Sequence, residues 1–555
     1  MEISFFNNRS VDFKKKYNFI FFSLCLGIAL IVFGFSILNV MDYMPWYRFI
    51  SNISIFVELI LLILALIIIK NNYVPKQLIY ILFLSLVPII QYNLGLVNHF
   101  STAFLSFSYI LILFFGAFSS FNLFRNNNNF IHIFLIFIII LCCTQIILSY
   151  LQWLNINFEI LSPYENNTQR IYGSFRQPNN LASYLLVSFL CVLYYIEKEL
   201  IEKKLSLFLL LNIIFCLVLT QSRAGIVSFL LILLFFVFYN KKFKNIHHKD
   251  IFFYFFIFLF LNFSINLIQN FFNKIFKINF LLDRSLVERV TQENTRFDLW
   301  DFFIQVIVDA PWYGYGWYQT QVAQYENFDS LKGIFTSTHN IILDLLLWNG
   351  IYIGFFIVLE FFFLFYCLYK SIKQSSDYMI FLCLIVFISH SMFEFPLFYP
   401  YFLFLFSVFW GYLLYQGDFS KFKISRSILI FFIFSITCGI YFVYKDYMNY
   451  QENKVYATNS GMGYHQKYNI DIKVLDILED ELYLLSVNKL DKLNYDQIEH
   501  IEHLVSNNMT FYNLLKFSQI LYNNGQEEKL NQISHKLESI YGYQLDRTEL
   551  MELQF

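Results

Sequence analysis

Long apolar runs limit most strongly what this chain can fold into. Thirteen apolar runs of roughly 16–30 residues follow one another along the sequence, and about 20 residues in a helix are enough to cross a bilayer. Of the 555 residues, 58% are hydrophobic and only 8 are Pro, so the runs are rarely interrupted. A water-soluble globular protein is excluded, and we predict an all-α polytopic transmembrane helical bundle. The spans are expected near 17–40, 53–69, 78–97, 103–122, 130–153, 180–196, 205–220, 223–239, 251–272, 340–369, 378–394, 400–415 and 427–444.

Lys and Arg residues set the predicted orientation, because positively charged loops stay on the cytoplasmic side of a membrane. Arg9 and Lys14–Lys16 precede the first span, so we expect a cytoplasmic N-terminus. If the spans alternate from there, nineteen Lys and Arg residues lie on the inner side. The four in short outer loops are Arg48, Arg170, Arg176 and Arg223. The odd number of spans then places the C-terminal end outside.

Two stretches are too hydrophilic to cross the membrane. Residues 273–339 are predicted to form a large outer loop within a transmembrane domain of residues 1–444. Residues 445–555 are predicted to form a small helical domain outside the membrane, with helical patterns at 471–478 and 530–537. The net charge of −1 gives no general attraction to nucleic acid, so we expect no nucleic-acid partner. All eight cysteines fall inside spans, which offers no disulfide framework.

Arg223 is unusual because only Thr220-Gln-Ser separates the two apolar runs around it. A charged side chain at the centre of a membrane helix costs about 2.5–3.5 kcal/mol on insertion scales, and less near an interface. A guanidinium forms paired hydrogen bonds with phosphate, so a diphosphate would offset that cost. The alternative is an interfacial Arg that reaches out to lipid phosphates.

His339 lies where the hydrophilic loop meets an apolar helix. An imidazole, with an unperturbed pKa of about 6.5, accepts a proton near neutral pH, which indicates a general base. The alternative is a histidine that caps or flanks the helix, and Thr338 or Asn340 are equally suitable caps.

Amides gather before the sixth span, in Gln177-Pro178-Asn179-Asn180. They can orient a sugar or pyrophosphate oxygen without a change in charge, whereas a simple helix cap would leave Gln177 unused. His390 and Glu394 share a helix face, but no further His, Asp or Glu has the spacing of a metal site. We therefore expect no metal and no cofactor. Because nucleotide triphosphates are cytosolic, chemistry outside needs an activated donor, such as a lipid-linked sugar diphosphate stabilised by Arg charges.

Six segments within 170–410 together resemble the bacterial O-antigen ligase superfamily, the Wzy/WaaL-like proteins. The Gln-Pro-Asn and Glu-x-Pro-Leu-x-Tyr segments and the polar tail are most like the PglL-type protein O-oligosaccharyltransferases. The six segments are Gly173-Ser-Phe-Arg-Gln-Pro-Asn-Asn-Leu-Ala, Thr220-Gln-Ser-Arg, Arg296 with Trp300, Pro311 to Trp317, Thr338-His339-Asn340 and Glu394-Phe-Pro-Leu-Phe-Tyr399-Pro-Tyr401.

The resemblance implies a multi-pass enzyme of the bacterial inner membrane with an active site facing the periplasm. It would transfer a preassembled glycan en bloc, without a metal, from undecaprenyl diphosphate to Ser or Thr of periplasmic proteins such as pilin. His339 matches the family's essential histidine. Arg223 and Arg296 match its diphosphate-binding arginines, and Arg170 is a further candidate contact. Arg176 stands where a small residue is expected. The substrate-positioning candidates are Gln177, Asn179, Asn180, Glu394, Tyr399 and Tyr401.

Two other functions stay open at this point. A ligase that moves glycan onto lipid A-core, or an O-antigen polymerase, would use the same donor chemistry. A non-enzymatic carrier or flippase of lipid-linked sugars should instead have charges along a path through the bilayer. The ionisable residues deep in the spans are few, chiefly Glu58, Asp344 and Glu360, which favours chemistry at one face.

Overall fold

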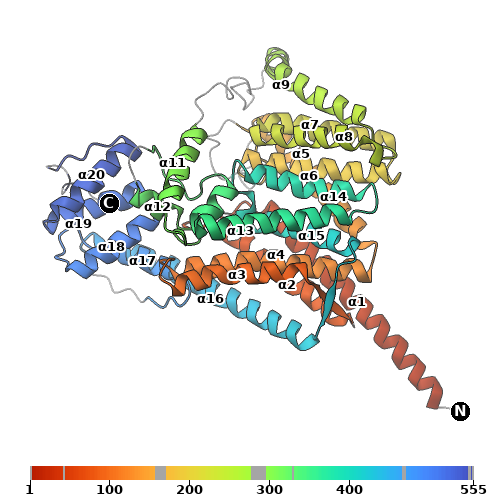
Figure 1. Ribbon diagram of the computed structural model, residues 1–555, viewed down its shortest axis with the longest axis horizontal. Helices are drawn as coiled ribbons and strands as arrows, with labels where there is room; N and C mark the ends of the chain where they lie inside the picture. Colours follow the sequence, from red (N-terminus) through yellow and green to blue (C-terminus); the bar gives the residue numbers. More distant parts are fainter. Residues whose placement is uncertain are drawn as a thin grey trace. The chain divides into compact units, whose positions relative to one another are not determined.

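The computed structural model describes residues 3–41, 44–69, 71–156, 170–276, 295–327, 331–464 and 470–547, together with 550 and 552. Within these ranges the chain is almost entirely helical (Figure 1), which confirms the predicted all-α class. The two short strands described, β1 (Asn72–Pro75) and β2 (Lys421–Ile424), pair antiparallel with Asn72 opposite Ile424. Residues Arg284 and Arg289 of the predicted outer loop lie outside the described residues.

Each predicted span coincides with one helix. Ten helices in the described ranges are long and apolar enough to cross a membrane, so this is a polytopic membrane protein. Helices α3, α14 and α15 are shorter, at 17, 15 and 17 residues, whereas α8 is continued by the short helix η1 (Asn240–Lys242) to a span of 20 residues. The number of thirteen spans and their orientation stay predictions. The helices are α1 (Ile3–Leu38), α2 (Phe49–Ile68), α3 (Gln77–Asn93), α4 (Phe100–Asn126), α5 (Phe130–Trp153), α6 (Pro178–Glu197), α7 (Lys203–Thr220), α8 (Arg223–Tyr239), α9 (His248–Phe276), α13 (Ile341–Ser371), α14 (Asp377–Ser391), α15 (Pro400–Gln416) and α16 (Arg426–Gly461).

The contacts divide the chain into two compact units, and neither is one continuous segment. Unit 1 comprises Met1–Ile81, Ile112–Glu293 and Phe363–Ile436. Unit 2 comprises Leu82–Leu111, Asn294–Phe362 and Thr437–Phe555. The tail thus shares a unit with part of the predicted outer loop, and the domain boundary at 444 stays a prediction.

Helix α6 lies at the centre of unit 1. It packs against α5, α7, α8 and α14 (Figure 1), and almost all of it is buried. Pro178 occupies the first helical position, where its fixed φ suits the helix and its missing N–H leaves no bond unmade. The sequence motif Gln177-Pro178-Asn179-Asn180 therefore begins the most enclosed helix of the unit.

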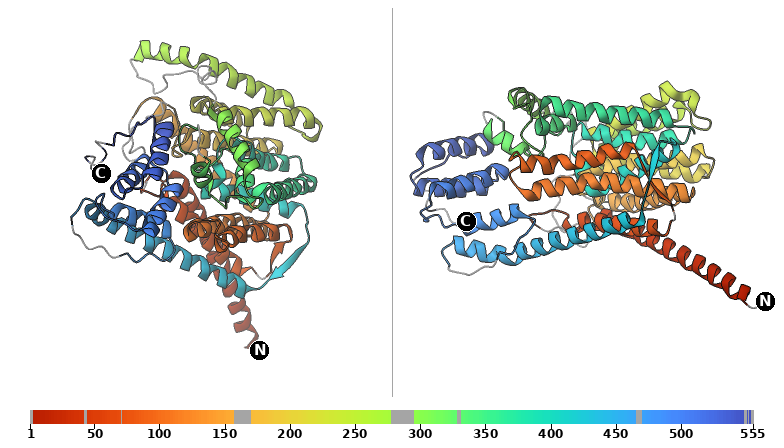
Figure 2. Two further views of the ribbon diagram at one scale, coloured as in Figure 1. Left: turned by 60° about the vertical axis from the view of Figure 1, so that its left-hand side comes forward. Right: turned by 60° about the horizontal axis from the view of Figure 1, so that its bottom comes forward.

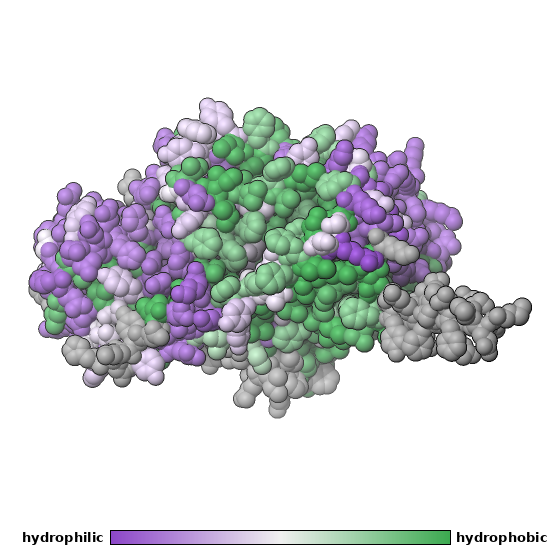
Figure 3. Space-filling view, turned by 90° about the horizontal axis from the view of Figure 1, so that it is seen from below, coloured by the Kyte–Doolittle hydropathy of each residue, from purple (hydrophilic) through white to green (hydrophobic). Residues whose placement is uncertain are grey.

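The outward faces of the membrane helices are apolar. In α16, which is little buried, Phe431 and Phe434 are exposed, and hydrophobic side chains cover a broad area of the face seen in Figure 3. In water such a patch would be far larger than monomeric proteins tolerate, so these side chains face lipid.

The tail in unit 2 contains α17 (Asp476–Ser486), α18 (Tyr495–Asn507), α19 (Phe511–Asn523) and α20 (Glu527–Tyr541) (Figure 2). The predicted helical patterns fall in or beside α17 and within α20. Leu504, Phe517, Leu530 and Leu537 are among the residues of its hydrophobic core. This region is helical, as the sequence predicts.

Helix α17 is fixed to the first turn of α4 within the same unit. The carboxylate of Asp476 accepts hydrogen bonds from the backbone N–H groups of Phe100 and Ser101, at 2.7 and 2.8 Å. His99 lies 2.8 Å from Asp480. An acidic side chain at a helix N-terminus satisfies N–H groups that have no partner within the helix.

Two further helices of unit 2 belong to the predicted outer loop. They are α11 (Thr295–Asp309) and α12 (Thr320–Glu326). The Tyr325 hydroxyl on α12 donates to Glu502 at 3.1 Å, and Lys536 donates to the Tyr325 carbonyl at 2.9 Å. Tyr325 and Ile334 also pack against the tail core, so the segment that leads to His339 is anchored in the tail.

Candidate functional site

Three of the sequence segments meet at the N-terminus of α6. Gln177 and Asn179 donate through their amide nitrogens to the two carboxylate oxygens of Glu394, at 3.4 and 3.2 Å. Glu394 lies between α14 and the short helix η2 (Pro396–Phe398) and is only 7% exposed. A buried carboxylate needs such donors because it has lost its water. The two motifs, 215 residues apart, thus form one structure.

Asn179 links these residues to the turn between α7 and α8. Ser222 donates to the Asn179 side-chain oxygen at 2.7 Å, and Arg170 donates to the same oxygen at 3.3 Å. Ser222 also accepts from the Gly225 N–H at 3.0 Å and so caps α8. We call Arg170, Gln177, Asn179, Ser222 and Glu394 the Asn179 cluster.

The Arg170 guanidinium donates to backbone carbonyls of the protein. Its Nε donates to the Thr220 carbonyl at 3.1 Å and its Nη2 to the Gln221 carbonyl at 3.3 Å. It therefore fixes the turn before α8, and a phosphate contact by Arg170 stays a proposal.

Arg223 begins α8, and α7 ends at Thr220, so the short polar break does separate two helices. Its side chain is exposed. Exposure suits both a diphosphate contact and a guanidinium that reaches lipid phosphates. Measurement of glycan transfer by variants of Arg223 would distinguish these two roles.

Tyr399 and Tyr401 flank the same region, with ring centroids 5.6 Å apart. The Arg48 guanidinium lies 5.3 Å from the Tyr401 ring centroid. Arg48 precedes α2, and its sequence neighbours give no sign that it would be buried beside these tyrosines. Arg176, placed where a small residue is expected, donates to the Val40 carbonyl. His390 lies 2.7 Å from the Ser183 hydroxyl between α6 and α14, as a polar packing residue would.

His339 belongs to unit 2, in the turn before α13. Its φ of 56° is in the left-handed region, which costs a residue other than Gly about 1–3 kcal/mol. Asp344, almost fully buried in the first turn of α13, accepts from the Ser337 hydroxyl at 2.7 Å and from the Thr338 N–H at 2.8 Å. Ser337 in turn accepts from the His339 N–H at 3.0 Å. Asp344 thus holds the backbone of this turn.

The capping role at α13 belongs to a different residue. The Asn340 side-chain oxygen accepts from the Ile342 N–H at 3.0 Å. This was one of the two caps open from the sequence, so His339 is not the cap of α13. The ring is partly exposed and lies edge-on to Phe335, with centroids 6.1 Å apart.

Arg296 lies on α11, in the same unit as His339. Trp300, one turn later on that helix, donates its indole N–H to the Thr338 carbonyl at 3.1 Å. Residues four apart share a helix face, so Arg296 lies on the α11 face that contacts the His339 turn.

The Pro311 to Trp317 segment is structural, as its glycines indicate. Backbone N–H groups of Tyr315 and Gly316 donate to the Leu347 and Trp348 carbonyls, both at 3.0 Å. Gly314 has φ 76°, and a Cβ there would lie 2.3 Å from the Gly350 nitrogen. Only glycine permits this approach to α13.

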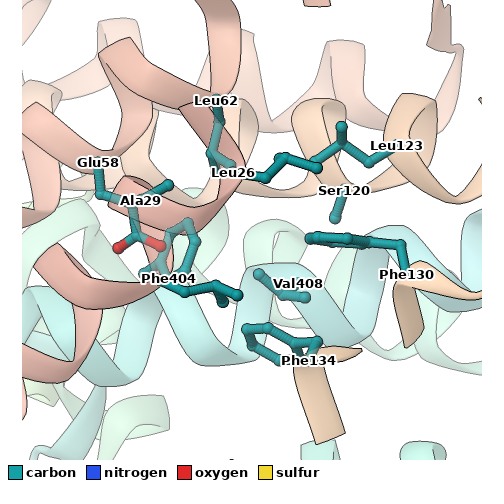
Figure 4. Close-up of a pocket in the computed structure, with 11 residues that line it drawn as sticks. Leu26, Ala29, Glu58, Leu62, Ser120, Leu123, Phe130, Phe134, Phe404 and Val408 are labelled. Atoms are coloured by element: carbon teal, nitrogen blue, oxygen red, sulfur yellow. The ribbon is translucent and has the colours of Figure 1, made fainter. Parts of the chain in front are cut away.

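A small cavity of about 10 Å³ lies elsewhere in unit 1, among α1, α2, α4, α5 and α15 (Figure 4). It is large enough for a single water molecule. Glu58, Ala29 and Phe404 line one side of it, and Ser120 lies across from them (Figure 4). A cavity of this size cannot hold a sugar. In the described part of the chain, no group of three His, Cys, Asp or Glu residues could hold a metal ion.

Comparisons with known proteins agree on one family. The family model described as O-antigen ligase matches residues 206–359. A general O-oligosaccharyltransferase of Acinetobacter baylyi is 30% identical over 512 residues, which cover 88% of this chain and 87% of the relative. A ComP-specific O-oligosaccharyltransferase of the same organism is 31% identical over 430 residues, which cover 74% of this chain and 76% of that protein.

Proposed function

Because the chain belongs to the O-oligosaccharyltransferase family within the O-antigen ligase superfamily, we propose that it moves a preassembled glycan en bloc from undecaprenyl diphosphate to Ser or Thr of periplasmic proteins. The chain is an O-linked oligosaccharyltransferase of a multi-pass membrane type. The observation that carries the proposal is that similarity to two such enzymes covers most of the chain. A pilin is the acceptor we propose to test first, at the periplasmic face of the inner membrane.

The proposed reaction is an inverting displacement at the anomeric carbon. His339 takes the proton of the acceptor hydroxyl, whose oxygen forms a bond to the anomeric carbon of the first sugar. The bond from that carbon to the phosphate oxygen breaks, and undecaprenyl diphosphate departs. A positioned general base contributes about 10²–10⁴-fold to the rate. The hold that Asp344 exerts on the His339 turn supports this role, because a base must be positioned to act.

Fixed positive charge neutralises the departing diphosphate in this proposal, with no metal required. Arg223 and Arg296 supply it, with Arg170 as a further contact. Preorganised charges act strongly in a site that excludes water, and guanidinium groups pair with phosphate oxygens in a bidentate way. The partial burial of Arg296 on the α11 face beside the His339 turn supports its assignment.

The polar residues around α6 position the donor glycan. Glu394 orients the amides of Gln177 and Asn179, and Asn180, Tyr399 and Tyr401 lie beside them. Amides and phenols can bind sugar hydroxyls as donors and as acceptors. We assign Gln177, Asn179, Asn180, Glu394, Tyr399 and Tyr401 to this positioning.

The test expresses the chain in cells that make a lipid-linked glycan, together with a pilin and with lipid A-core. Mass spectrometry then measures glycan on protein and on lipid A. Glycan on Ser or Thr of the pilin is the expected result. Glycan on lipid A-core alone, or a longer lipid-linked glycan alone, would make the chain a ligase or a polymerase, and no transfer at all would favour a carrier.

A further inference from the structure

Arg48 is a buried cation whose hydrogen bonds are incomplete. Its side chain is only 5% exposed, and one guanidinium nitrogen, Nη2, donates to the Ser174 carbonyl. The other, Nη1, is fully buried and has no hydrogen-bond partner. Among the described residues, no Asp or Glu forms an ion pair with Arg48.

Two further buried polar side chains, Asn180 and Tyr401, lie in the same part of unit 1. The Asn180 amide faces the Tyr399 and Tyr401 hydroxyls, but neither amide atom of Asn180 nor the Tyr401 hydroxyl forms a hydrogen bond of normal geometry. Asn180 lies next to the Tyr401 hydroxyl, and the Arg48 guanidinium lies 5.3 Å from the Tyr401 ring centroid. We call Arg48, Asn180 and Tyr401 the Arg48 group, and all three belong to unit 1.

The backbone carbonyl that accepts from Arg48 belongs to a well-anchored residue. Ser174 exchanges two hydrogen bonds with Gln145, at 2.8 and 3.0 Å, and donates its hydroxyl to the Ile37 carbonyl at 2.7 Å. Buried polar atoms in native proteins almost always have partners, and a buried charge without one is especially unfavourable. Several such atoms in one place indicate a missing polar ligand.

The chemistry of the group selects an anion with several oxygens. Arg48, the Tyr401 hydroxyl and the Asn180 NH₂ can all donate, and one of the three carries a positive charge. The Asn180 carbonyl can accept in addition, as a sugar hydroxyl would require. A phosphate attached to a sugar meets both needs, whereas a neutral glycan would leave the charge of Arg48 uncompensated.

We propose that Arg48 is a further diphosphate-binding residue, with Asn180 and Tyr401 beside it at the junction of the diphosphate and the first sugar. The inference rests on the proposed function. A stacking contact with Tyr401 alone would explain the 5.3 Å distance and would leave Nη1 unused. The head group of an anionic phospholipid has the same phosphate chemistry, so the experiment must separate the two sources.

The experiment measures binding of undecaprenyl diphosphate to the full-length chain in nanodiscs, by titration and by its effect on Tm. The variants are Arg48→Gln and Arg48→Lys. The matched control is Arg125→Gln, because Arg125 also stacks on a tyrosine, with its guanidinium 4.3 Å from the Tyr73 ring centroid. Nanodiscs with and without phosphatidylglycerol separate the two phosphate sources.

We expect Arg48→Gln to raise the Kd for undecaprenyl diphosphate at least tenfold without a lower Tm in the absence of ligand. Arg48→Lys should raise it less, since it keeps the charge and loses the planar fork. If the Gln variant does not fold, the Lys variant decides. Arg125→Gln should bind as the wild type does.

An unchanged Kd in both Arg48 variants would overturn the inference. The inference would also be overturned if phosphatidylglycerol, and not undecaprenyl diphosphate, raised the Tm of the chain in a way that depends on Arg48. Binding does not require transfer, so the two proposals can fail separately. If binding depends on Arg48 but the wild-type chain transfers no glycan, only the proposed function is contradicted. If Arg48→Gln binds the diphosphate and transfers glycan as the wild type does, only this inference is contradicted.

Discussion

The Asn179 cluster of unit 1 and the His339 turn of unit 2 are both polar sites, but they are built differently. In the Asn179 cluster, side chains from several helix ends bond to one another, as Asn179 does with Glu394 and Ser222. In the His339 turn, one carboxylate, Asp344, fixes a short stretch of backbone close to it in sequence. The first arrangement suits the shaping of a substrate pocket. The second suits the aiming of a single reactive group.

The largest effect should come from the reactive group of unit 2. We expect His339→Ala to lower glycosylation by about 10²–10⁴-fold, the usual contribution of a general base, with normal membrane insertion. Glycosylated acceptor is measured by mass spectrometry. The control is His247→Ala, because His247 is exposed outside the described sites. Retained activity in His339→Ala would remove the base role.

The next largest effect should come from the support of that group. Asp344→Asn removes the charge and puts an NH₂ group opposite one of the two donors, Ser337 or Thr338. The turn should therefore loosen and kcat should fall roughly 10- to 100-fold, as for loss of hydrogen bonds to a charged group. Glu360→Gln on the same helix should leave kcat unchanged. Equal kcat in Asp344→Asn and the wild type would show that the hydrogen bonds of Asp344 to this turn are not needed for catalysis.

A smaller effect is expected in the Asn179 cluster, because several hydrogen bonds hold each side chain there and the loss of one leaves the others. Glu394→Gln replaces one acceptor oxygen by an NH₂ group, which then faces the NH₂ group of Gln177 or Asn179. The KM for the lipid-linked donor should therefore rise about 3- to 10-fold, or ~1 kcal/mol. Steady-state kinetics with varied donor measures this. Glu197→Gln is the control, since Glu197 lies at the other end of α6 and binds backbone N–H groups there. A fall in kcat with unchanged KM would contradict a positioning role.

The smallest effect on glycan transfer is expected from the tail, where the predicted change is in stability. Burial lowers the pKa of Lys516 from about 10.5 to about 8, and its ammonium donates to the Leu485 carbonyl at 2.8 Å. Between these two pH values the unfolded chain binds a proton that the folded chain does not, so stability should rise with pH in that window. Melting of the full chain from pH 7 to 10.5 measures it. Lys516→Met should flatten the rise, and an identical pH profile in the variant would contradict the assignment.

Local features were predictable from the sequence to a large extent. Every predicted span coincides with a helix, because hydrophobic length is counted residue by residue. The turn around His339 was also within reach, since Ser337, Thr338, Asn340 and Asp344 are neighbours in the chain and form local hydrogen bonds. The choice between Thr338 and Asn340 as the cap was not, because both have a suitable side chain.

The Arg48 group was beyond prediction. Arg48 looked like one of four charges in short outer loops, and its bond to the Ser174 carbonyl joins residues 126 positions apart. The partition of the chain into two units was equally hidden, because each unit is assembled from three separate segments.

By itself the sequence determined the membrane class, the helical spans and the few polar residues that interrupt them. These depend on the transfer of each residue between water and lipid, which is additive along the chain. Only the tertiary structure decided that Asn179 links Glu394 to Ser222, that Asp344 holds the His339 turn, and that Arg48 is buried with an unused nitrogen. Burial and hydrogen bonding between distant segments depend on how helices pack, and no single segment contains that information.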